Sequence, residues 1–281
     1  MSQISVYNGY DREELDRQLD NSRAVPNHEE YFARYRELSA KSRAQREGRL
    51  DIPYGGGEME KLDVFAAPAT DGPTFIFVHG GWWRRLDKSD FVYVADPFVS
   101  AGISVVNVNY ALAPNVTIPE IVREVRAATR WTFEHVRDWN GDPSRIFIGG
   151  HSVGGHLAAL AAVTDPVAGL TTISGVHDVE PVFLSYVNEW ARMGPEDVVP
   201  LSPIKNLPAR RIPLIAAAGE KETDEFRRQT AIYARAWRER GYPVSERYPD
   251  HDHFSIMLEL ADAESELTRE IVAQCLSAAK V

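Results

Sequence analysis

A serine flanked by closely spaced glycines is the strongest indication of chemistry in this sequence. The segment Gly150-His151-Ser152-Val153-Gly154 fits the pattern G-x-S-x-G. Small residues two before and two after the serine permit a sharp strand-to-helix turn, where larger side chains would collide with the returning backbone. Residues 145–148 suit the preceding strand and residues 155–162 suit a tightly packed helix. We therefore predict that Ser152 is a nucleophile presented at such a turn.

The same glycines could instead belong to a dinucleotide-binding loop. That loop requires the pattern G-x-G-x-x-G and an acidic residue about 20 positions later. The glycines at positions 149, 150, 154 and 155 do not have this spacing. His151 and His156 flank the serine, and residues beside such a turn usually serve packing. We expect neither of them to be the catalytic base.

A second glycine pair could stabilise negative charge. The segment His79-Gly80-Gly81-Trp82-Trp83 directly follows an apolar run at residues 74–78. Adjacent glycines let the backbone turn its amide hydrogens toward a carbonyl oxygen that becomes negative in the transition state. The amide of Val153 would meet the same oxygen at the positive end of a helix. We predict an oxyanion hole formed by the amides of Gly80, Gly81, Trp82 and Val153.

A serine hydroxyl needs an imidazole to accept its proton and a carboxylate to orient that imidazole. Behind a turn of this kind, the acid and then the histidine follow the serine along the chain. Glu222 lies three positions after Gly219, which follows an apolar strand at residues 212–217. We predict that Glu222 is the acid. The alternatives are Glu220, Asp224 and, after the preceding strand, Asp178.

The base is expected in the loop between a strand at residues 244–248 and the last helix. His253 could reach back over the sheet toward the serine, and we predict that it is the base, with His251 as the alternative. The segment Asp250-His251-Asp252-His253 also contains side chains that bind zinc or manganese. No obvious further ligand is present in the sequence, so we expect no metal and no cofactor.

The segments around these residues predict an α/β fold. Runs rich in β-branched and apolar residues alternate with amphipathic segments, which is typical of a mostly parallel, doubly wound sheet with helices on both faces. Ligands of such sheets bind beyond the carboxyl ends of the strands, where the predicted catalytic residues lie. The expected strands are residues 62–66, 74–78, 103–108, 145–148, 170–173, 212–217 and 244–248, and the expected helices are residues 118–139, 155–163, 224–240 and 255–278.

Two further segments could surround the site. Residues 1–50 are charged and helix-prone, with an interruption at Val25-Pro26, and are predicted to form an N-terminal helical arm. Residues 179–210 are too long for a simple connection and are expected to form a small cap insertion. Aromatic walls suit a flat aromatic substrate. The predicted substrate contacts are Trp82, Trp83, Phe183, Tyr186 and Trp190, and arm residues Tyr10, Tyr31 and Phe32 could close another side.

Length and composition limit the class of protein. A chain of 281 residues is expected to form one α/β domain, and its net charge of −10 would repel nucleic acid and anionic membranes. No apolar run approaches the roughly 20 residues of a membrane span, and residues 1–5 lack the regions of a signal peptide, so we expect a cytoplasmic protein. Cys275 is the single cysteine, which excludes an intrachain disulfide. The expected partner is a small molecule, and a homodimer is an open alternative.

The motifs together resemble a known family. Residues 79–83, 150–156, 219–226 and 252–254 are similar to the kynurenine formamidase (arylformamidase) branch of the α/β-hydrolases, and the likeness begins near Tyr10. The resemblance implies the α/β-hydrolase fold, Ser152, Glu222 and His253 as nucleophile, acid and base, and removal of a formyl group from an aromatic amine without a metal. The alternative activity is that of a carboxylesterase or general amidase on another small aromatic substrate. The alternative class is a non-catalytic binding protein of the same fold.

Overall fold

The computed structural model describes residues 5–277 of the chain. Residues 1–4, where a signal peptide would begin, and Ala278, the predicted end of the last helix, lie outside the described residues. Of the helices between residues 5 and 277, none combines the length and hydropathy that a membrane crossing requires.

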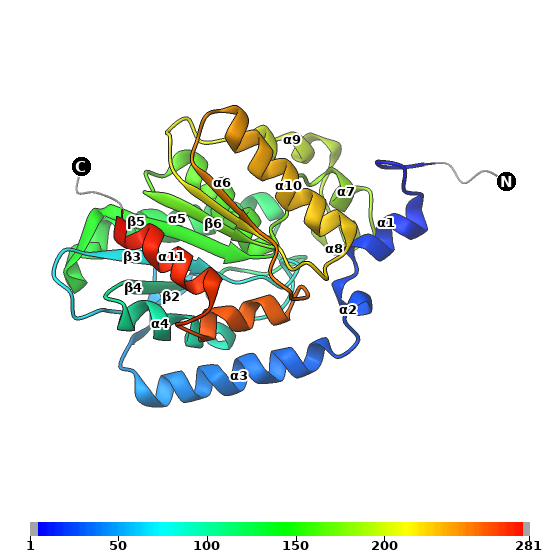
Figure 1. Cartoon of the computed structure of the whole chain (residues 1–281). Coiled ribbons are helices and arrows are strands. Elements are labelled where there is room, and N and C mark those ends of the chain that lie inside the picture. Colours follow the sequence, from blue (N-terminus) through cyan, green and yellow to red (C-terminus); the bar gives the residue numbers. More distant parts are fainter. Residues whose placement is uncertain (1–4, 278–281) are drawn as a thin grey trace.

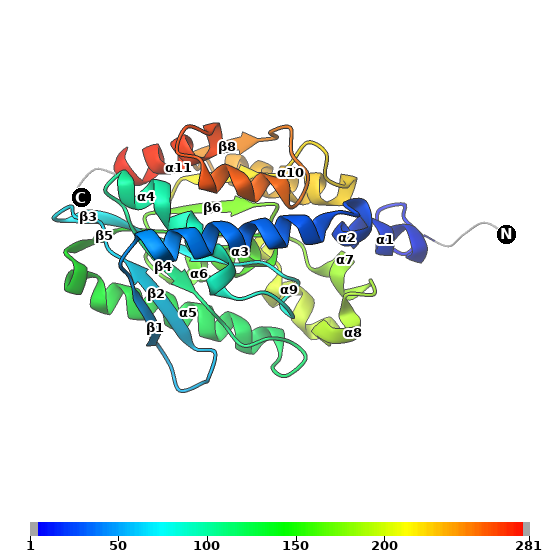
Figure 2. The ribbon, with the colours of Figure 1, turned by 90° about the horizontal axis from the view of Figure 1, so that it is seen from below.

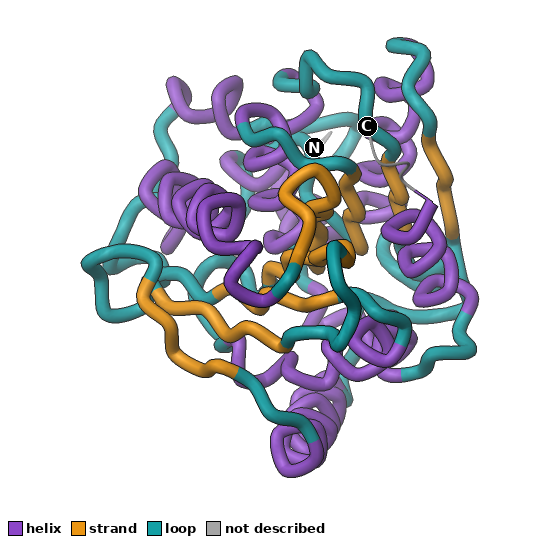
Figure 3. The backbone as a smooth tube through the Cα atoms, turned by 90° about the vertical axis from the view of Figure 1, so that its left-hand side faces the viewer, coloured by secondary structure: helices purple, strands orange, loops and turns teal. Residues whose placement is uncertain are grey.

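An eight-stranded sheet forms the centre of the molecule, in the order β1-β2-β4-β3-β5-β6-β7-β8. β2 pairs antiparallel with β1 and with β4, and the other neighbouring pairs are parallel. Figure 3 shows these strands between layers of helices. The strands are β1 (Arg49–Pro53), β2 (Lys61–Phe65), β3 (Gly72–Val78), β4 (Ser104–Val108), β5 (Gly141–His151), β6 (Gly169–Ile173), β7 (Leu214–Ala217) and β8 (Val244–Arg247).

Alternate residues of the central strands face two separate cores. In β3, Ile76 and Val78 belong to one buried cluster, whereas Phe75 and Phe77 belong to the other. Successive side chains of a strand point to opposite faces of the sheet. A nearly continuous apolar strand therefore requires helices on both faces, as the sequence predicted.

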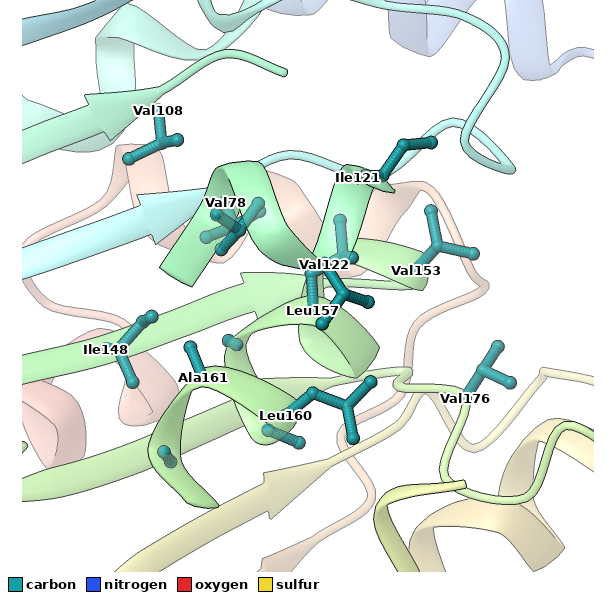
Figure 4. Packing of buried hydrophobic residues seen from close by; sticks show 14 of the residues in the cluster. Val78, Val108, Ile121, Val122, Ile148, Val153, Leu157, Leu160, Ala161 and Val176 are labelled. Carbon is teal, nitrogen blue, oxygen red and sulfur yellow. The ribbon is translucent and has the colours of Figure 1, made fainter. Parts of the chain in front are cut away.

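The two helical layers cover these cores, with α10 above the sheet and α3 below it in Figure 1. Figure 4 shows side chains of the first core, among them Leu157 of the helix after β5 and Val78 and Ile148 of the sheet. The first layer contains α5 (Ile118–His135), η2 (Val136–Trp139), α6 (Val153–Thr164) and α10 (Asp224–Glu239). The second layer contains α3 (His28–Gln45), η1 (Lys88–Val94), α4 (Ala95–Ser100), η5 (Ser255–Ala261) and α11 (Glu266–Ser277).

The N-terminal helices of the chain pack against both cores. They are α1 (Arg12–Leu19), α2 (Asn21–Ala24) and α3, and the interruption at Val25-Pro26 separates the last two helices. Leu15 and Leu19 of α1 belong to the first core, whereas Phe32 and Tyr35 of α3 belong to the second. Figure 2 shows α3 lying along the second layer. The segment that joins these helices therefore passes the end of the sheet at which β5 and β7 finish.

The connection between β6 and β7 contains only short helices. They are α7 (Glu180–Phe183), α8 (Asn188–Ala191), η3 (Pro195–Asp197), α9 (Val198–Leu201) and η4 (Pro203–Lys205). Val182, Val187 and Leu201 from this connection are buried in the first core. Residues 179–210 are thus held on the main body along much of their length.

Two elements differ from the sequence-based expectation. β1 was not predicted, because it is an edge strand whose side chains are largely exposed, Leu50 to 48%, so it lacks an apolar pattern. The single helix expected at residues 255–278 is instead two helices, η5 and α11. The backbone turns after η5, where the hydroxyl of Ser265 donates to the carbonyl of Glu259 and accepts from the amide of Thr268. Serine at this position caps the start of α11 and favours a new helix.

Candidate active site

The turn between β5 and α6 presents Ser152 in a strained backbone conformation. Its φ is 55° and its ψ is −124°, a combination that side-chain-bearing residues rarely adopt. A Cβ atom on Gly154 would lie 2.1 Å from the carbonyl oxygen of Val78, and one on Gly150 would lie 2.4 Å from Gly154 itself. No side chain fits at either position. The two glycines of the motif are therefore required by the close approach of β3 and α6.

The structure brings the three predicted catalytic side chains together. Nε2 of His253 lies 3.2 Å from Oγ of Ser152, and Nδ1 of His253 lies 2.7 Å from Oε2 of Glu222. Ser152, His253 and Glu222 are 2%, 4% and 6% exposed. The carboxylate can only accept, so Nδ1 of His253 donates to it and Nε2 presents its lone pair to the serine hydroxyl. This arrangement can remove a proton from Ser152.

Two further donors fix the carboxylate of Glu222. Its Oε1 accepts from the hydroxyl of Ser174 at 2.5 Å and from the amide of Gly219 at 2.7 Å. Ser174 directly follows β6, and Gly219 follows β7, so the ends of two neighbouring strands hold the acid. Both carboxylate oxygens are thereby occupied. The ring of His253 can meet Glu222 in one orientation only.

The alternative acids and the alternative base lie elsewhere. Glu220 and Asp224 are exposed, and Asp178 accepts from the hydroxyl of Tyr7 at 2.9 Å. The ring of His251 lies 3.0 Å from Oε1 of Glu259 and 3.2 Å from the hydroxyl of Ser255. Because these groups have other partners or face solvent, the structure places only Glu222 beside the histidine that faces Ser152.

The loop after β3 lies against the serine. A Cβ atom on Gly80 would be 3.1 Å from Cβ of Ser152. Gly81 has a φ of 109°, and a Cβ there would lie 2.0 Å from the carbonyl oxygen of Arg85. Trp82 also has a positive φ, of 51°. These turns are tight enough to require glycine at positions 80 and 81.

Several backbone amides near Ser152 have no partner. No group among residues 5–277 accepts a hydrogen bond from the amides of Gly80, Gly81 or Trp82. Val153 is the first residue of α6, and the first amide of a helix has no partner inside it. The four amides of the predicted oxyanion hole therefore have no hydrogen-bond acceptor among the described residues.

Residues beneath this loop hold it in place. The hydroxyl of Tyr110 donates to the carbonyl of His79 at 2.8 Å, and the two rings stack with centroids 4.4 Å apart. Nε2 of His79 lies 3.1 Å from Oδ1 of Asn109. Burial lowers the pKa of His79, so this ring stays neutral at physiological pH. No pattern in the sequence indicated the roles of Asn109 and Tyr110.

A cavity adjoins the serine. Its walls include Ser152, His253 and the predicted substrate contact Trp82. Arm residues Asn21, Phe32 and Tyr35 also line it. The arm, and not the segment 179–210, therefore contributes to the walls of this cavity.

The structure does not bring the other predicted aromatic contacts to the cavity. Trp83 is 0% exposed, with its ring edge-on to that of His156 at 5.2 Å. Trp190 donates from Nε1 to the carbonyl of Trp82 at 3.0 Å and packs against Tyr186. Phe183 is partly buried against the first core. Trp190 thus holds the loop through the carbonyl of Trp82, because the connection after β6 docks beside Trp82.

Comparison with known proteins places the chain in a family. The family model BD-FAE matches residues 62–225, which is more than half of the chain. The chain belongs to the BD-FAE family of α/β-hydrolases. The matched region runs from β2 through the serine turn to Glu225, just after the predicted acid. The protein is therefore a hydrolase, and the predicted fold class is confirmed.

Individual relatives of this α/β-hydrolase cover nearly its whole length. It is 30% identical to the kynurenine formamidase of Salmo salar over 289 aligned positions, which cover 95% of this chain and 97% of that protein. The kynurenine formamidase of Danio rerio is 33% identical, covering 78% of this chain and 79% of that protein. A solved structure of a candidate thioesterase from a Silicibacter species is 27% identical, with a TM-score of 0.79 over 91% of this chain and 98% of that one.

The described residues of this α/β-hydrolase contain no group of side chains arranged as a metal site. Between residues 5 and 277, no three His, Cys, Asp or Glu side chains lie close enough together to hold an ion. In the segment 250–253, His251 turns toward Glu259 and His253 turns toward Glu222. The two histidine rings thus interact with different carboxylates.

Proposed function

We propose that this protein is a serine hydrolase that removes a formyl group from an aromatic amine through an acyl-enzyme. The observation that carries the proposal is the continuous contact from Glu222 through His253 to Ser152, at 2.7 and 3.2 Å, in front of unpartnered amides. In this proposal the three residues are the acid, base and nucleophile. The identity to two kynurenine formamidases supports the choice of substrate.

The first half-reaction forms the acyl-enzyme. His253 takes the proton of Ser152 as the serine oxygen attacks the formyl carbon, and Glu222 stabilises the resulting imidazolium. The substrate oxygen becomes negative and accepts hydrogen bonds from the free amides of Gly81 and Trp82, with that of Val153. When the tetrahedral intermediate collapses, the carbon–nitrogen bond breaks. His253 gives its proton to the departing aromatic amine.

The second half-reaction releases formate. A water molecule enters beside His253, which removes one proton as the water oxygen attacks the formyl ester of Ser152. The intermediate collapses with cleavage of the carbon–serine bond, and the proton returns to the serine oxygen. Every proton is carried by His253, and no further reactant is needed.

The lining of the cavity beside Ser152 suits an aromatic substrate. Phe32, Phe91 and Trp82 line the same cavity and offer apolar surface to an aromatic ring.

Ester hydrolysis is the second candidate function. The 27% identity to a candidate thioesterase structure favours it, and the same nucleophile and oxyanion amides would act on an ester carbonyl. The intact chain of catalytic contacts argues against the alternative of a non-catalytic binding protein. We also propose a cytoplasmic location, as expected from the sequence, and cell fractionation with an antibody to this chain tests it.

The proposed reaction is tested by comparing kcat/KM for N-formylkynurenine, an aryl acetate and an acetanilide with the purified protein. The formamidase proposal predicts the highest value for N-formylkynurenine. A higher value for the aryl acetate, with no detectable release of formate from N-formylkynurenine, would establish the esterase instead. Loss of both activities in Ser152→Ala is required in either case.

A further inference from the structure

Two polar side chains in the active-site cavity take no part in the proposed reaction. Arg85 and Asn21 both line the cavity that contains Ser152. Arg85 belongs to the loop that carries the free amides, whereas Asn21 is the first residue of α2. They are close in space, because Nη2 of Arg85 donates to Oγ of Ser22 at 3.2 Å.

Arg85 is a half-buried cation without an anionic partner. Within residues 5–277, no carboxylate lies within 4.0 Å of its guanidinium, although Glu29 and Asp20 act on it from a greater distance. Its hydrogen bond to Ser22 uses one of five N–H donors, and its guanidinium carbon lies 5.2 Å from the ring centre of Phe32. Burial lowers the pKa of Arg85, which shows that the surroundings disfavour its charge.

Two other partly buried arginines of this chain are paired with carboxylates. Nε of Arg46 lies 2.9 Å from a carboxylate oxygen of Asp96, and Nε of Arg228 lies 2.8 Å from one of Glu225. Removing a cation from water without a partner costs free energy that an ion pair otherwise offsets. Arg126 is partly buried without an ion pair in the described chain, but it donates to the carbonyl of Leu160. Arg85 differs from Arg126 in its position, because it lines the cavity that contains the predicted nucleophile.

Asn21 supplies a second unused donor on the same cavity. The residue is 4% exposed, and its Nδ2 has no hydrogen-bond acceptor in the described chain. A buried amide donor without a partner is unfavourable, because it has lost its hydrogen bonds to water. An acceptor brought by a bound molecule would replace one of them. Asn21 and Arg85 together offer N–H donors and one positive charge. Neither side chain is negatively charged, so neither would repel a carboxylate.

We infer that Arg85 and Asn21 form a subsite that binds a carboxylate group of the substrate. This inference rests on the proposed function and specifies its substrate class as an aromatic formamide that carries a carboxylate. A carboxylate has two oxygens that only accept, which suits a guanidinium and an amide side by side. The aromatic ring would lie along Phe32 and Trp82, with the formyl carbon at Ser152.

The test compares two substrates that differ only in the charge of one group. They are N-formylkynurenine and its carboxamide, in which the carboxylate is replaced by a neutral amide. For the wild type, we expect kcat/KM to favour the carboxylate. In Arg85→Gln this preference should fall about 10- to 100-fold, mainly through KM, because a hydrogen bond to a charged group is lost. Arg85→Lys should keep part of the preference, since the charge remains.

Asn21→Asp is the second variant, and it is nearly isosteric. A negative side chain beside the substrate carboxylate should lower the preference at least about 10-fold, whereas a merely structural role would affect both substrates equally. Arg84→Gln is the matched control. Arg84 is exposed, stacks on Trp190 at 4.3 Å and lies outside the cavity, so its loss should leave the preference unchanged.

A binding measurement separates this inference from the proposed function. Calorimetric titration with kynurenine and kynurenine carboxamide requires no turnover. We expect the wild type to bind the carboxylate at least about 10-fold more tightly, and Arg85→Gln to bind both alike. Equal binding of both by the wild type, or an unchanged preference in Arg85→Gln, would overturn the subsite. Failure of the wild type to release formate from N-formylkynurenine would overturn the formamidase proposal, while the titration would still decide the subsite.

Discussion

Nε2 of His151 lies 2.8 Å from the carbonyl oxygen of His253, so the residue before the predicted nucleophile holds the backbone of the predicted base. The carbonyl can only accept, so His151 donates through Nε2. The two rings are 4.7 Å apart. Burial and the neighbouring His253 keep the pKa of His151 well below its ordinary value. His151 therefore stays neutral and does not oppose a positive charge on His253 during turnover.

Replacing His151 should misplace the base. We expect His151→Leu to lower kcat about 5- to 10-fold, because the lost hydrogen bond stabilises the position of His253 by about 1 kcal/mol. His151→Gln retains an N–H donor and should keep most of the activity. Steady-state kinetics on N-formylkynurenine or an aryl acetate would measure both. A leucine variant with the wild-type kcat would show that this contact has no catalytic role.

Tyr110 is expected to hold the oxyanion loop through its hydroxyl. In Tyr110→Phe the carbonyl of His79 loses its 2.8 Å hydrogen bond, and we expect kcat to fall about 10-fold with KM nearly unchanged. Tyr93→Phe is the matched control, because the hydroxyl of Tyr93 is also buried and donates to a backbone carbonyl, that of Met257, away from the loop. The two variants should lose similar stability in urea. Equal effects on kcat would refute the assignment.

Gly154 should tolerate no side chain. The Cβ of Gly154→Ala would overlap the carbonyl oxygen of Val78, at 2.1 Å, so we expect the free energy of unfolding to fall by at least about 2 kcal/mol and activity to be lost. Gly56→Ala is the control, since a Cβ on Gly56 meets nothing within 4 Å. Urea titration followed by tryptophan fluorescence measures both. Wild-type stability of the Gly154 variant would contradict the geometry of the turn.

Stability should decline with acidification because buried histidines are held neutral. Burial lowers the pKa of His156 to about 4, whereas an unfolded histidine has a pKa near 6.5. Between these values the unfolded chain binds more protons than the native one, so the free energy of unfolding falls as pH decreases and is constant for this group above about 6.5. The contribution of His156 is on the order of 3 kcal/mol.

Urea titrations at pH 7.5, 6 and 5 measure this dependence. His156→Gln is the control, because glutamine cannot be protonated and can still donate to the carbonyl of Leu201, which His156 contacts at 2.8 Å. Its stability should change less with pH than that of the wild type. Parallel pH profiles of the two proteins would exclude His156 as a cause of the acid sensitivity.

The sequence was sufficient for features that depend on short segments. The turn around Ser152 could be predicted because its small residues lie within five positions. The acid and the base could be located because each follows a strand that the sequence indicates, in the chain order serine, acid, histidine. The same local patterns located most strands of the sheet. Edge strand β1 was missed, because a strand with exposed side chains has no apolar periodicity.

Contacts between distant segments could not be read in this way. Ser174 reaches Glu222 across two strand ends, and Tyr110 reaches His79 from the end of β4. The sequence also indicated helices in the arm but not the surface on which they dock, so Asn21 and Tyr35 were not expected at the cavity. Phe183, Tyr186 and Trp190 were expected there, but they pack outside the cavity. Their aromatic character alone could not distinguish a side chain that lines the cavity from one that packs beside it.

The central claim is that the hydroxyl of Ser152 is activated by His253, and labelling with a fluorophosphonate tests it most directly. Intact-mass analysis at pH 7.5 followed by peptide mapping should find one adduct per chain, on Ser152. His253→Gln should slow the labelling at least about 10³-fold, and Ser152→Ala should abolish both labelling and turnover, the latter on the order of 10⁶-fold. A hydrolytically active protein that leaves Ser152 unlabelled, or a Ser152→Ala variant with near-normal turnover, would contradict the account.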